Sequence, residues 1–196
     1  MPKVVDHDER RREIVAAMWR ILLRDGMGAV TVRALAGEAG WSLGAIRHYF
    51  TSQDELILFA MGEMLVSIAG RMGSLDFHNP DRAVLQNAIE EMIPLDRQRK
   101  VEAQIWFALL TRRIANPQVA VKAHDLDHVV RSTVRQVLLE LATANLLSAD
   151  RDLEVEAVRL HALIDGLALH GLSDRPLDSP AAIRAAISTH LKDLAR

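Results

Sequence analysis

The chain has 196 residues, with 24 Lys and Arg against 26 Asp and Glu, so its formal net charge is −2. This balance excludes a uniformly basic nucleic-acid coat and an acidic solubilising tail. Hydrophobic residues make up 49%, which predicts a folded core, and the absence of cysteine excludes disulfides, thiolate zinc sites and cysteine nucleophiles. The charged N-terminus and the lack of a long apolar stretch favour a cytoplasmic protein with no membrane partner.

Helical periodicity dominates the chain, and no alternating strand pattern persists beyond a few residues. Ser52 and Glu55 form a capping box that starts one helix. An amide or hydroxyl acceptor followed by proline predicts three further starts, at Asn79-Pro80, Asn116-Pro117 and Ser179-Pro180. We therefore predict an all-α protein of about nine helices, roughly 8–25, 32–39, 43–50, 52–72, 80–93, 97–115, 117–145, 152–172 and 179–194. The loops include residues 73–80 and 173–180.

Residues 26–56 predict a helix-turn-helix. Thr31 can cap a short helix that ends at Gly40, and Ser42 can cap the helix that follows. Two short helices joined by a glycine-containing turn form the motif whose second helix enters the major groove of DNA.

The second of these helices carries side chains suited to reading DNA. If Ile46 and Phe50 face the core, then Leu43, Arg47 and His48 point outward, with Tyr49 at the flank. Arg47 could donate two hydrogen bonds to a guanine edge, and Leu43 could touch a thymine methyl group. The candidate phosphate contacts are Thr31, Ser42, His48 and Tyr49.

The order and spacing of these residues resemble the TetR family of transcriptional regulators. The matching residues are Ile14, Ala16, Ala17, Gly26, Thr31, Val32, Ala36, Ala39, Gly40, Ser42, Gly44, Ile46, Phe50 and Leu56. The resemblance implies a TetR-like fold, with an N-terminal three-helix DNA-binding domain at residues 1–51 and its helix-turn-helix at about 31–50. Residues 52–196 would form a C-terminal helical bundle for regulation, ligand binding and dimerisation.

The resemblance implies a set of DNA-binding residues. They are Thr31, Arg33, Ser42, Leu43, Gly44, Arg47, His48, Tyr49 and Gln53. Family members often carry Tyr in place of Arg47 and Lys in place of Gln53, and Gln53 can bind a phosphate without supplying a charge.

The variant from Ile46 to Phe50, Ile-Arg-His-Tyr-Phe, resembles the BetI-like branch of the family. Three further segments are similar to the regulatory domain of that branch, namely 93–96, 104–108 with 116–117, and 159–168. The chain therefore resembles a TetR-family regulator with a BetI-like C-terminal domain.

The family implies a homodimeric regulator that binds double-stranded, palindromic operator DNA and is released by a small-molecule effector. Neither the effector nor the operator sequence follows from the resemblance. The alternatives are a ligand-independent or architectural DNA-binding dimer, and a helical protein with enzymatic or metal-binding activity. Because no Gly-rich phosphate loop, nucleophile elbow or His-Glu-x-x-His pair occurs, we expect no enzyme, no catalytic residue and no cofactor.

Two further sets of residues are candidates within the regulatory domain. Residues that could line an apolar effector pocket are Met61, Met64, Leu65, Met92, Trp106, Phe107 and Leu110, with Phe77 beside them. The helix from Leu153 to Leu172 is apolar nearly all the way round, so one face can meet the core and the other a symmetry mate. Its predicted dimer contacts are Leu163, Gly166, Leu167 and His170, although a central helix of a monomer would show the same composition.

Two histidine pairs have the spacing of metal ligands. His124 and His128 lie four residues apart, as do His161 and Asp165. No third ligand can be assigned, so we interpret the first pair as a solvated face and the second as a structural contact, and we expect no metal site.

The net charge divides between the two predicted domains. Residues 1–50 hold 8 Lys and Arg against 6 Asp and Glu, a net charge of +2, which leaves 16 basic and 20 acidic residues, a net of −4. Because +2 is modest, contacts with DNA are expected from individually placed groups more than from a broad basic field. These groups are Arg10, Arg11, Arg12, Arg33, Arg47 and the helix N-termini.

Overall fold

The computed structural model describes residues 7–78, 80–173 and 178–195, and every regular element within these ranges is a helix. The all-α prediction is confirmed. The chain divides into two compact units, of which one comprises Met1–Leu65 with Gln104–Ala123 and the other Val66–Ala103 with His124–Arg196. These units describe packing, and the functional division after residue 51 stays a prediction.

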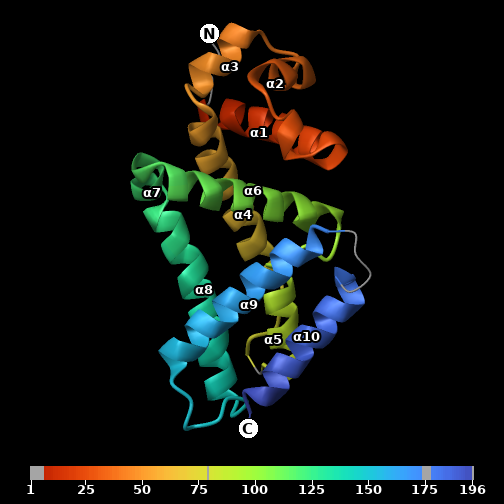
Figure 1. Cartoon of the computed structure of the whole chain (residues 1–196), viewed down its shortest axis with the longest axis vertical. Coiled ribbons are helices and arrows are strands. Elements are labelled where there is room, and N and C mark those ends of the chain that lie inside the picture. The colour runs from red at the N-terminus through yellow and green to blue at the C-terminus, as the bar shows by residue number, and fades with distance from the viewer. Residues whose placement is uncertain (1–6, 79, 174–177, 196) are drawn as a thin grey trace. The chain divides into compact units, whose positions relative to one another are not determined.

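The first unit is built around three N-terminal helices (Figure 1). Its elements are α1 (His7–Asp25), the short 3₁₀ helix η1 (Met27–Ala29), α2 (Val32–Ala39), α3 (Leu43–Tyr49), the start of α4 (Gln53–Met72), the end of α6 (Arg97–Ala115) and α7 (Pro117–Lys122). Ile14, Met18 and Ile21 of α1 are fully buried, as are Leu35 of α2 and Ile46 of α3. These side chains form the apolar centre of the three-helix arrangement.

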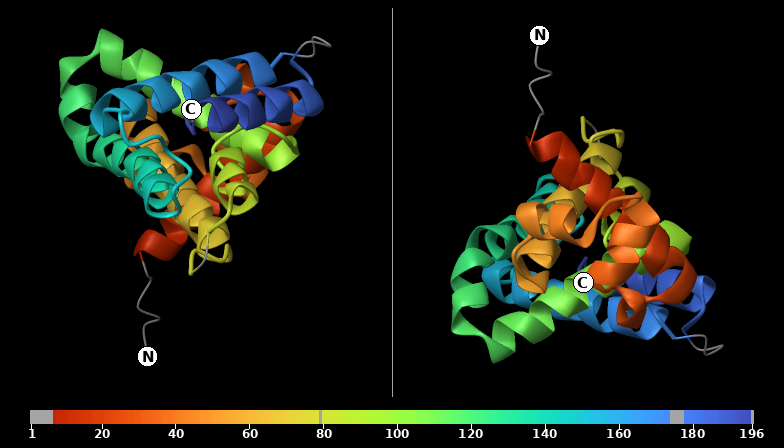
Figure 2. Two further views of the ribbon diagram at one scale, coloured as in Figure 1. Left: turned by 90° about the horizontal axis from the view of Figure 1, so that it is seen from below. Right: turned by 90° about the horizontal axis from the view of Figure 1, so that it is seen from above.

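The second unit is a bundle of longer helices. Its elements are the end of α4, α5 (Arg82–Glu90), the start of α6, α8 (His124–Thr143), α9 (Leu153–Gly171) and α10 (Pro180–Asp193). Helix α8 packs against α9 and α5, and α10 packs against α5 and α9 (Figures 1 and 2). Leu85, Ile89, Leu138, Leu160 and Ile187 are fully buried in the shared core.

Most of the helix starts that the sequence predicts are confirmed. The side chain of Asn116 accepts a hydrogen bond from the Gln118 N–H, and that of Ser179 accepts one from the Ala182 N–H. The predicted start at Pro80 is wrong, because Asp81 caps α5, which begins at Arg82. Asn79, in the predicted loop 73–80, lies outside the described residues. Residues 174–177, in the predicted loop 173–180, also lie outside them.

The single helix that we predict over 117–145 is two helices. α7 ends at Lys122, and its C-cap Ala123 has φ −84° and ψ −7°, after which α8 begins at His124. Ala123 is buried, and no Pro or Gly at or beside it signals the break in the sequence. The one local signal is acidic, because Asp125 and Asp127 lie in the first turn of α8, where the helix dipole favours negative charge.

A close contact fixes the residue type at the end of α9. Gly171 is buried, and a Cβ atom added there would lie 2.8 Å from Pro94 Cγ and 3.1 Å from Ile183 Cδ1. The first distance is shorter than any ordinary carbon contact. The end of α9 can therefore approach the proline loop and α10 only because residue 171 has no side chain.

Candidate nucleic-acid interface

Side-chain caps define the two helices of the motif. Thr31 Oγ1 accepts a hydrogen bond from the Ala34 N–H at 3.1 Å, and Ser42 Oγ accepts one from the Ala45 N–H at 3.1 Å. Gly40 ends α2 with φ +71°, a left-handed conformation that glycine adopts without steric cost. All three local predictions are confirmed, and together they set the turn that presents α3.

Helix α3 has a buried and an exposed side, as the sequence predicts. Ile46 is 1% exposed, and Phe50, the C-cap of α3, is 4% exposed, whereas Leu43 is 45% exposed. Arg47 and His48 are also exposed, and Tyr49 is half-buried. Because Leu43 and Arg47 are one helical turn apart on the solvent side, they present an apolar contact and a forked donor on one face.

An aromatic cluster joins the end of α3 to the start of α1. The His7 ring lies 4.6 Å from that of Tyr49 and 5.8 Å from that of His48. Trp41, in the turn, makes an edge contact with Tyr49 at 5.4 Å, and the Arg10 guanidinium lies 5.5 Å from the Trp41 ring. Trp41 therefore packs within the turn, and the cluster ties the exposed helix to α1.

The basic run at the start of α1 is largely engaged within the protein. Arg11 lies over the rings of Phe50 and Phe59, at 4.8 and 4.5 Å, and donates to Glu55 at 3.1 Å. Arg10 forms an ion pair with Glu13 at 2.8 Å. Arg11 thus anchors α1 on α4, and its predicted contact with DNA phosphate stays a prediction, as does that of Arg10.

A hollow of about 440 Å³ lies between α2, α3 and the start of α4. Its polar lining residues are Thr31, Arg47, Thr51, Ser52 and Gln53, and its apolar ones are Val30, Val32, Leu35, Ile46, Phe50 and Leu56. The Gln53 side-chain amide also donates to the Val30 carbonyl at 3.4 Å. Hydroxyl, amide and guanidinium donors around one depression suit the phosphate oxygens of a nucleic-acid backbone.

The capping box at the start of α4 is one residue wider than the sequence predicts. Ser52 Oγ accepts from the Glu55 N–H at 3.1 Å, as expected. Glu55 Oε2, however, accepts from the N–H and the hydroxyl of Thr51, both at 3.0 Å, instead of from the Ser52 N–H. These bonds from Thr51, with the charges of Arg11 and Lys122, hold the pKa of Glu55 below its ordinary value.

The lowered pKa of Glu55 predicts a pH-dependent contribution to stability. Ionised Glu55 contributes fully above its ordinary pKa, and the contribution is lost as pH falls through the lower folded value. At pH 7 we expect Glu55→Gln to lower the free energy of unfolding by only about 0.5 kcal/mol, because the side chain is partly exposed and solvent weakens its interactions. The difference between variant and wild type should shrink below about pH 4.3, as measured by denaturant unfolding.

The control for this measurement is Glu63→Gln, which removes an exposed carboxylate 3.7 Å from Arg12 and no cap. We expect it to change stability less than Glu55→Gln at pH 7. An equal loss from Glu55→Gln at pH 7 and pH 3 would contradict the assignment of the cap to the ionised carboxylate.

The candidate effector residues fall in both compact units. Met61, Met64 and Trp106 are buried, and Leu65, Phe107 and Leu110 are partly buried, all six in the first unit. Met92 belongs to the second unit, where it and Phe77 pack against the core. Neither the hollow beside Arg47 nor the groove on α8 and α9 is lined by these residues. Their role in binding an effector stays a prediction.

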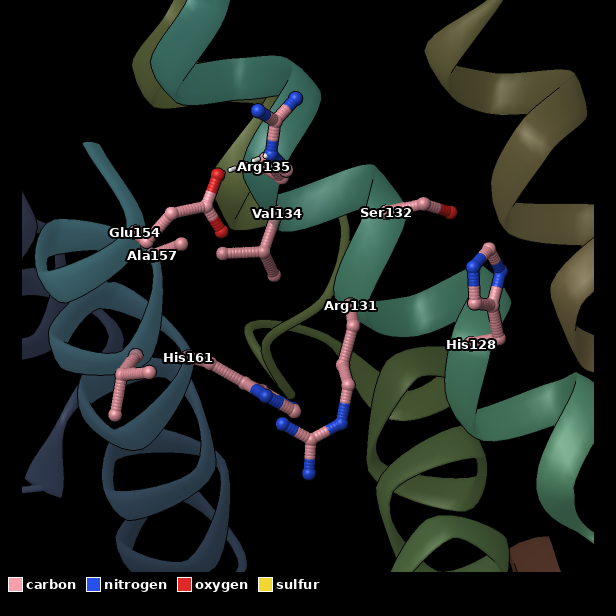
Figure 3. Close-up of a pocket in the computed structure, with 9 residues that line it drawn as sticks. His128, Arg131, Ser132, Val134, Arg135, Glu154, Ala157 and His161 are labelled. Atoms are coloured by element: carbon pink, nitrogen blue, oxygen red, sulfur yellow. Dashed lines mark hydrogen bonds and ion pairs between the residues drawn. The ribbon is translucent and has the colours of Figure 1, made fainter.

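A shallow groove of about 220 Å³ runs between α8 and α9 (Figure 3). Arg135 on α8 forms an ion pair with Glu154 on α9 at 2.7 Å. Figure 3 shows Arg131 and His161 extending into the groove from the two helices. Six of the nine lining residues are polar or charged, and the other three, Val134, Ala157 and Val158, are apolar.

The predicted dimer contacts on α9 differ in exposure. Leu163 and Leu167 are partly buried and pack against the core of the second unit, Gly166 is partly buried, and His170 is exposed, so their role in a dimer stays a prediction. An exposed apolar stripe on the same helix consists of Val155, Val158, Ala162 and Leu169. Its spacing of three, four and seven residues places all four on one face of the helix.

The histidine pairs lack the further ligands that a metal ion needs. No group of three His, Cys, Asp or Glu side chains is arranged for a metal ion in the part of the chain that the structure describes. His161 Nε2 lies 3.8 Å from Asp165 Oδ2, which is an ion-pair separation and too long for a hydrogen bond. Among the described helices, none is both long and apolar enough to span a bilayer.

Two family models match the chain. Residues 14–59 match the model for bacterial regulatory proteins of the tetR family, and residues 81–196 match the model for the C-terminal part of BetI-type transcriptional repressors. The first match includes the helix-turn-helix described above, and the second includes α5, α8, α9 and α10.

Curated relatives extend over nearly the whole chain. The HTH-type transcriptional regulator PksA of Bacillus subtilis is 36% identical over 196 residues, covering 99% of this chain and 94% of that protein. The HTH-type transcriptional regulator BetI of Pseudomonas fluorescens is 30% identical over 192 residues, covering 95% of this chain and 93% of that protein.

Solved structures share the fold. A transcriptional regulator from Saccharomonospora viridis, solved in complex with choline, superposes with a TM-score of 0.80 at 24% identity, over 94% of this chain and 96% of that one. A transcriptional regulator from Rhodococcus superposes with a TM-score of 0.78 at 24% identity, over 94% and 95% of the two chains. The expected fold of an N-terminal helix-turn-helix followed by a regulatory bundle is confirmed.

Proposed function

Because the chain belongs to the TetR family of transcriptional regulators, with a BetI-type C-terminal domain, we propose that it is a homodimeric repressor released from a palindromic operator by a small-molecule effector. One observation carries the DNA-binding assignment. The capped helix α3 presents Leu43, Arg47 and His48 to solvent while Ile46 is buried behind them. In this proposal residues 1–51 bind DNA and residues 52–196 dimerise and bind the effector.

The proposed contacts divide into base reading and positioning. Arg47 would donate two hydrogen bonds to a guanine, and Leu43 would contact a thymine methyl group. Residues that would contact the backbone are Thr31, Arg33, Ser42, Gly44, His48, Tyr49 and Gln53. The hollow beside Arg47 supports contacts of these residues with one duplex, because Thr31 and Gln53 line it together with Arg47.

The proposed dimer forms through α8 and α9 of two copies. The stripe of Val155, Val158, Ala162 and Leu169 supports this assignment, because large apolar side chains on a helix face are commonly covered by a partner. A two-fold dimer presents two copies of α3, which reach successive major grooves when they are about 34–36 Å apart.

The proposed effector acts by preferring one spacing of the two recognition helices. Such a ligand shifts the population of dimers only by its difference in affinity between the operator-bound and free forms. We propose Met61, Met64, Leu65, Met92, Trp106, Phe107 and Leu110 as candidate contacts. Choline is the ligand of the Saccharomonospora viridis protein, so it is one compound to test alongside other small cations and anions.

The proposal is tested by capturing genomic fragments of the source organism with the tagged chain and sequencing them. We expect enrichment of a few sites with an inverted repeat, and loss of these sites with the double variant Leu43→Ala, Arg47→Ala. Compounds are then added to the captured complex, and the effector is the one that releases DNA from the wild type. Uniform recovery of the genome by the wild type would overturn the proposal.

A further inference from the structure

Within the first unit, helix α6 forms hydrogen bonds with residues that precede and residues that follow the helix-turn-helix in the sequence. Gln104 Oε1 on α6 accepts a hydrogen bond from the Met27 N–H at 3.1 Å, ahead of α2. Arg112 Nη1 on α6 donates to Asp54 Oδ1 at 2.6 Å, in the first turn of α4. The partners are 77 and 58 residues apart in sequence, so both contacts depend on the folded chain.

The geometry of α6 makes these two contacts act together. Residues 104 and 112 are separated by about 12 Å along a helix that rises 1.5 Å per residue. A hydrogen-bonded helix does not stretch. Helix α6 therefore holds Met27 and Asp54 at a fixed separation. Met27 follows Gly26, whose φ of +77° sets the turn out of α1.

Both carboxylate oxygens of Asp54 contact side chains from α6 or from the start of α7. Asn116 Nδ2, at the start of α7, lies 3.5 Å from Asp54 Oδ2, while Arg112 holds Oδ1. The neighbouring Glu55 accepts a hydrogen bond from Arg11 of α1. The first turn of α4 is thus fixed between two helices, and that turn carries Gln53, which lines the hollow with Arg47.

We propose that Gln104 and Arg112 are positioning residues for operator binding, because they hold the two ends of the helix-turn-helix at the separation at which α3 and the first turn of α4 contact one DNA duplex together. This inference rests on the proposed function. It assigns to residues 104–116, which lie within the proposed regulatory domain, a direct part in the geometry of the DNA-binding surface.

The substitution Asp54→Asn distinguishes positioning of α4 by Arg112 from a direct effect of the Asp54 charge on DNA binding. It removes a negative charge close to the proposed DNA contacts, so Coulomb attraction alone would tighten binding to every DNA sequence. The variant also replaces the ion pair with Arg112 by a neutral hydrogen bond and puts an amide nitrogen opposite Asn116 Nδ2, and this loss would instead loosen the first turn of α4 and weaken binding to the operator. The two accounts predict opposite signs for one variant.

The experiment measures Kd by fluorescence anisotropy for a captured operator duplex and for a random duplex of equal length, at one salt concentration. We expect Asp54→Asn and Arg112→Gln each to weaken operator binding about fivefold to tenfold, with little change for random DNA. The double variant should be no weaker than either single one. The charge swap Asp54→Arg, Arg112→Asp should recover most of the operator affinity.

A second pair of variants tests the other contact. Gln104→Glu keeps an oxygen that can accept from the Met27 N–H, whereas Gln104→Met removes it at similar size. We expect only Gln104→Met to lose operator preference. Thr111→Ala is the control on the same helix, because the Thr111 hydroxyl donates to the Phe107 carbonyl of α6 itself.

The outcomes distinguish the inference from the function on which it rests. A wild type that binds operator and random DNA equally overturns the proposed function. A wild type that prefers its operator, with Asp54→Asn and Gln104→Met equal to it or tighter, overturns the inference alone. Equal weakening for both DNAs together with a lowered Tm also overturns it, because that result indicates a general loss of folded protein.

Discussion

Val158→Asp is expected to convert the protein from a dimer to a monomer. Val158 is 66% exposed in the single chain and lies in the apolar stripe of α9, so the change should leave the fold of each subunit intact. In a two-fold interface each copy would bury an unpaired carboxylate, at a cost of about 3–5 kcal/mol for each one. The two carboxylates of one dimer together cost at least about 6 kcal/mol, which lowers the association constant by more than roughly ten-thousandfold.

The measurement is sedimentation at micromolar concentration together with operator binding. The mass should fall from about twice 21.8 kDa to 21.8 kDa. Operator affinity should fall at least a hundredfold, because a monomer reads one half-site. Val66→Asp is the matched control, since Val66 is 71% exposed on α4, outside the stripe. A dimeric Val158→Asp protein, or a monomeric wild type, would contradict the proposed interface.

Arg47→Ala is expected to remove most of the discrimination between operator and random DNA. A bidentate contact from arginine to guanine contributes about 1–3 kcal/mol of preference for the correct base pair, and the proposed dimer makes one in each half-site, so the ratio of the two Kd values should fall at least roughly thirtyfold. Arg47 is exposed at the end of α3, so the fold should be unaffected. The measurement is the Kd for both duplexes at one fixed salt concentration.

Arg33→Ala is the companion variant. Arg33 is exposed on α2 and is proposed to contact phosphate, so its loss should weaken binding to both duplexes by a similar factor. The slope of log Kd against log salt concentration should also decrease by the equivalent of about two phosphate contacts, one from each subunit. If Arg47→Ala left the ratio unchanged, the assignment of Arg47 to base reading would be wrong.

The helix-turn-helix could be predicted from sequence because its signals are local. A cap acts within three residues, as Thr31 and Ser42 do, and the left-handed turn at Gly40 needs glycine itself. The buried positions of Ile46 and Phe50 follow from helical spacing once those ends are known. This local control accounts for the agreement over α2 and α3.

Features that depend on distant packing could not be predicted in the same way. Leu163 and Val158 are both apolar residues on α9, and periodicity cannot decide which of two apolar faces meets the core. No Pro or Gly marks the break at Ala123, and the partner of Asp54 lies 58 residues away. Even the capping box differs by one residue, because Thr51 offers Glu55 both a backbone and a hydroxyl donor.

The close contact between Gly171 and Pro94 limits which residues can occupy these two positions in homologous sequences. With a Cβ atom at residue 171 only 2.8 Å from Pro94 Cγ, a larger residue at the end of α9 is tolerated only if position 94 becomes smaller or its loop shifts. Positions 94 and 171 should therefore change as a pair, and a lineage that loses the glycine is expected to have lost the proline as well.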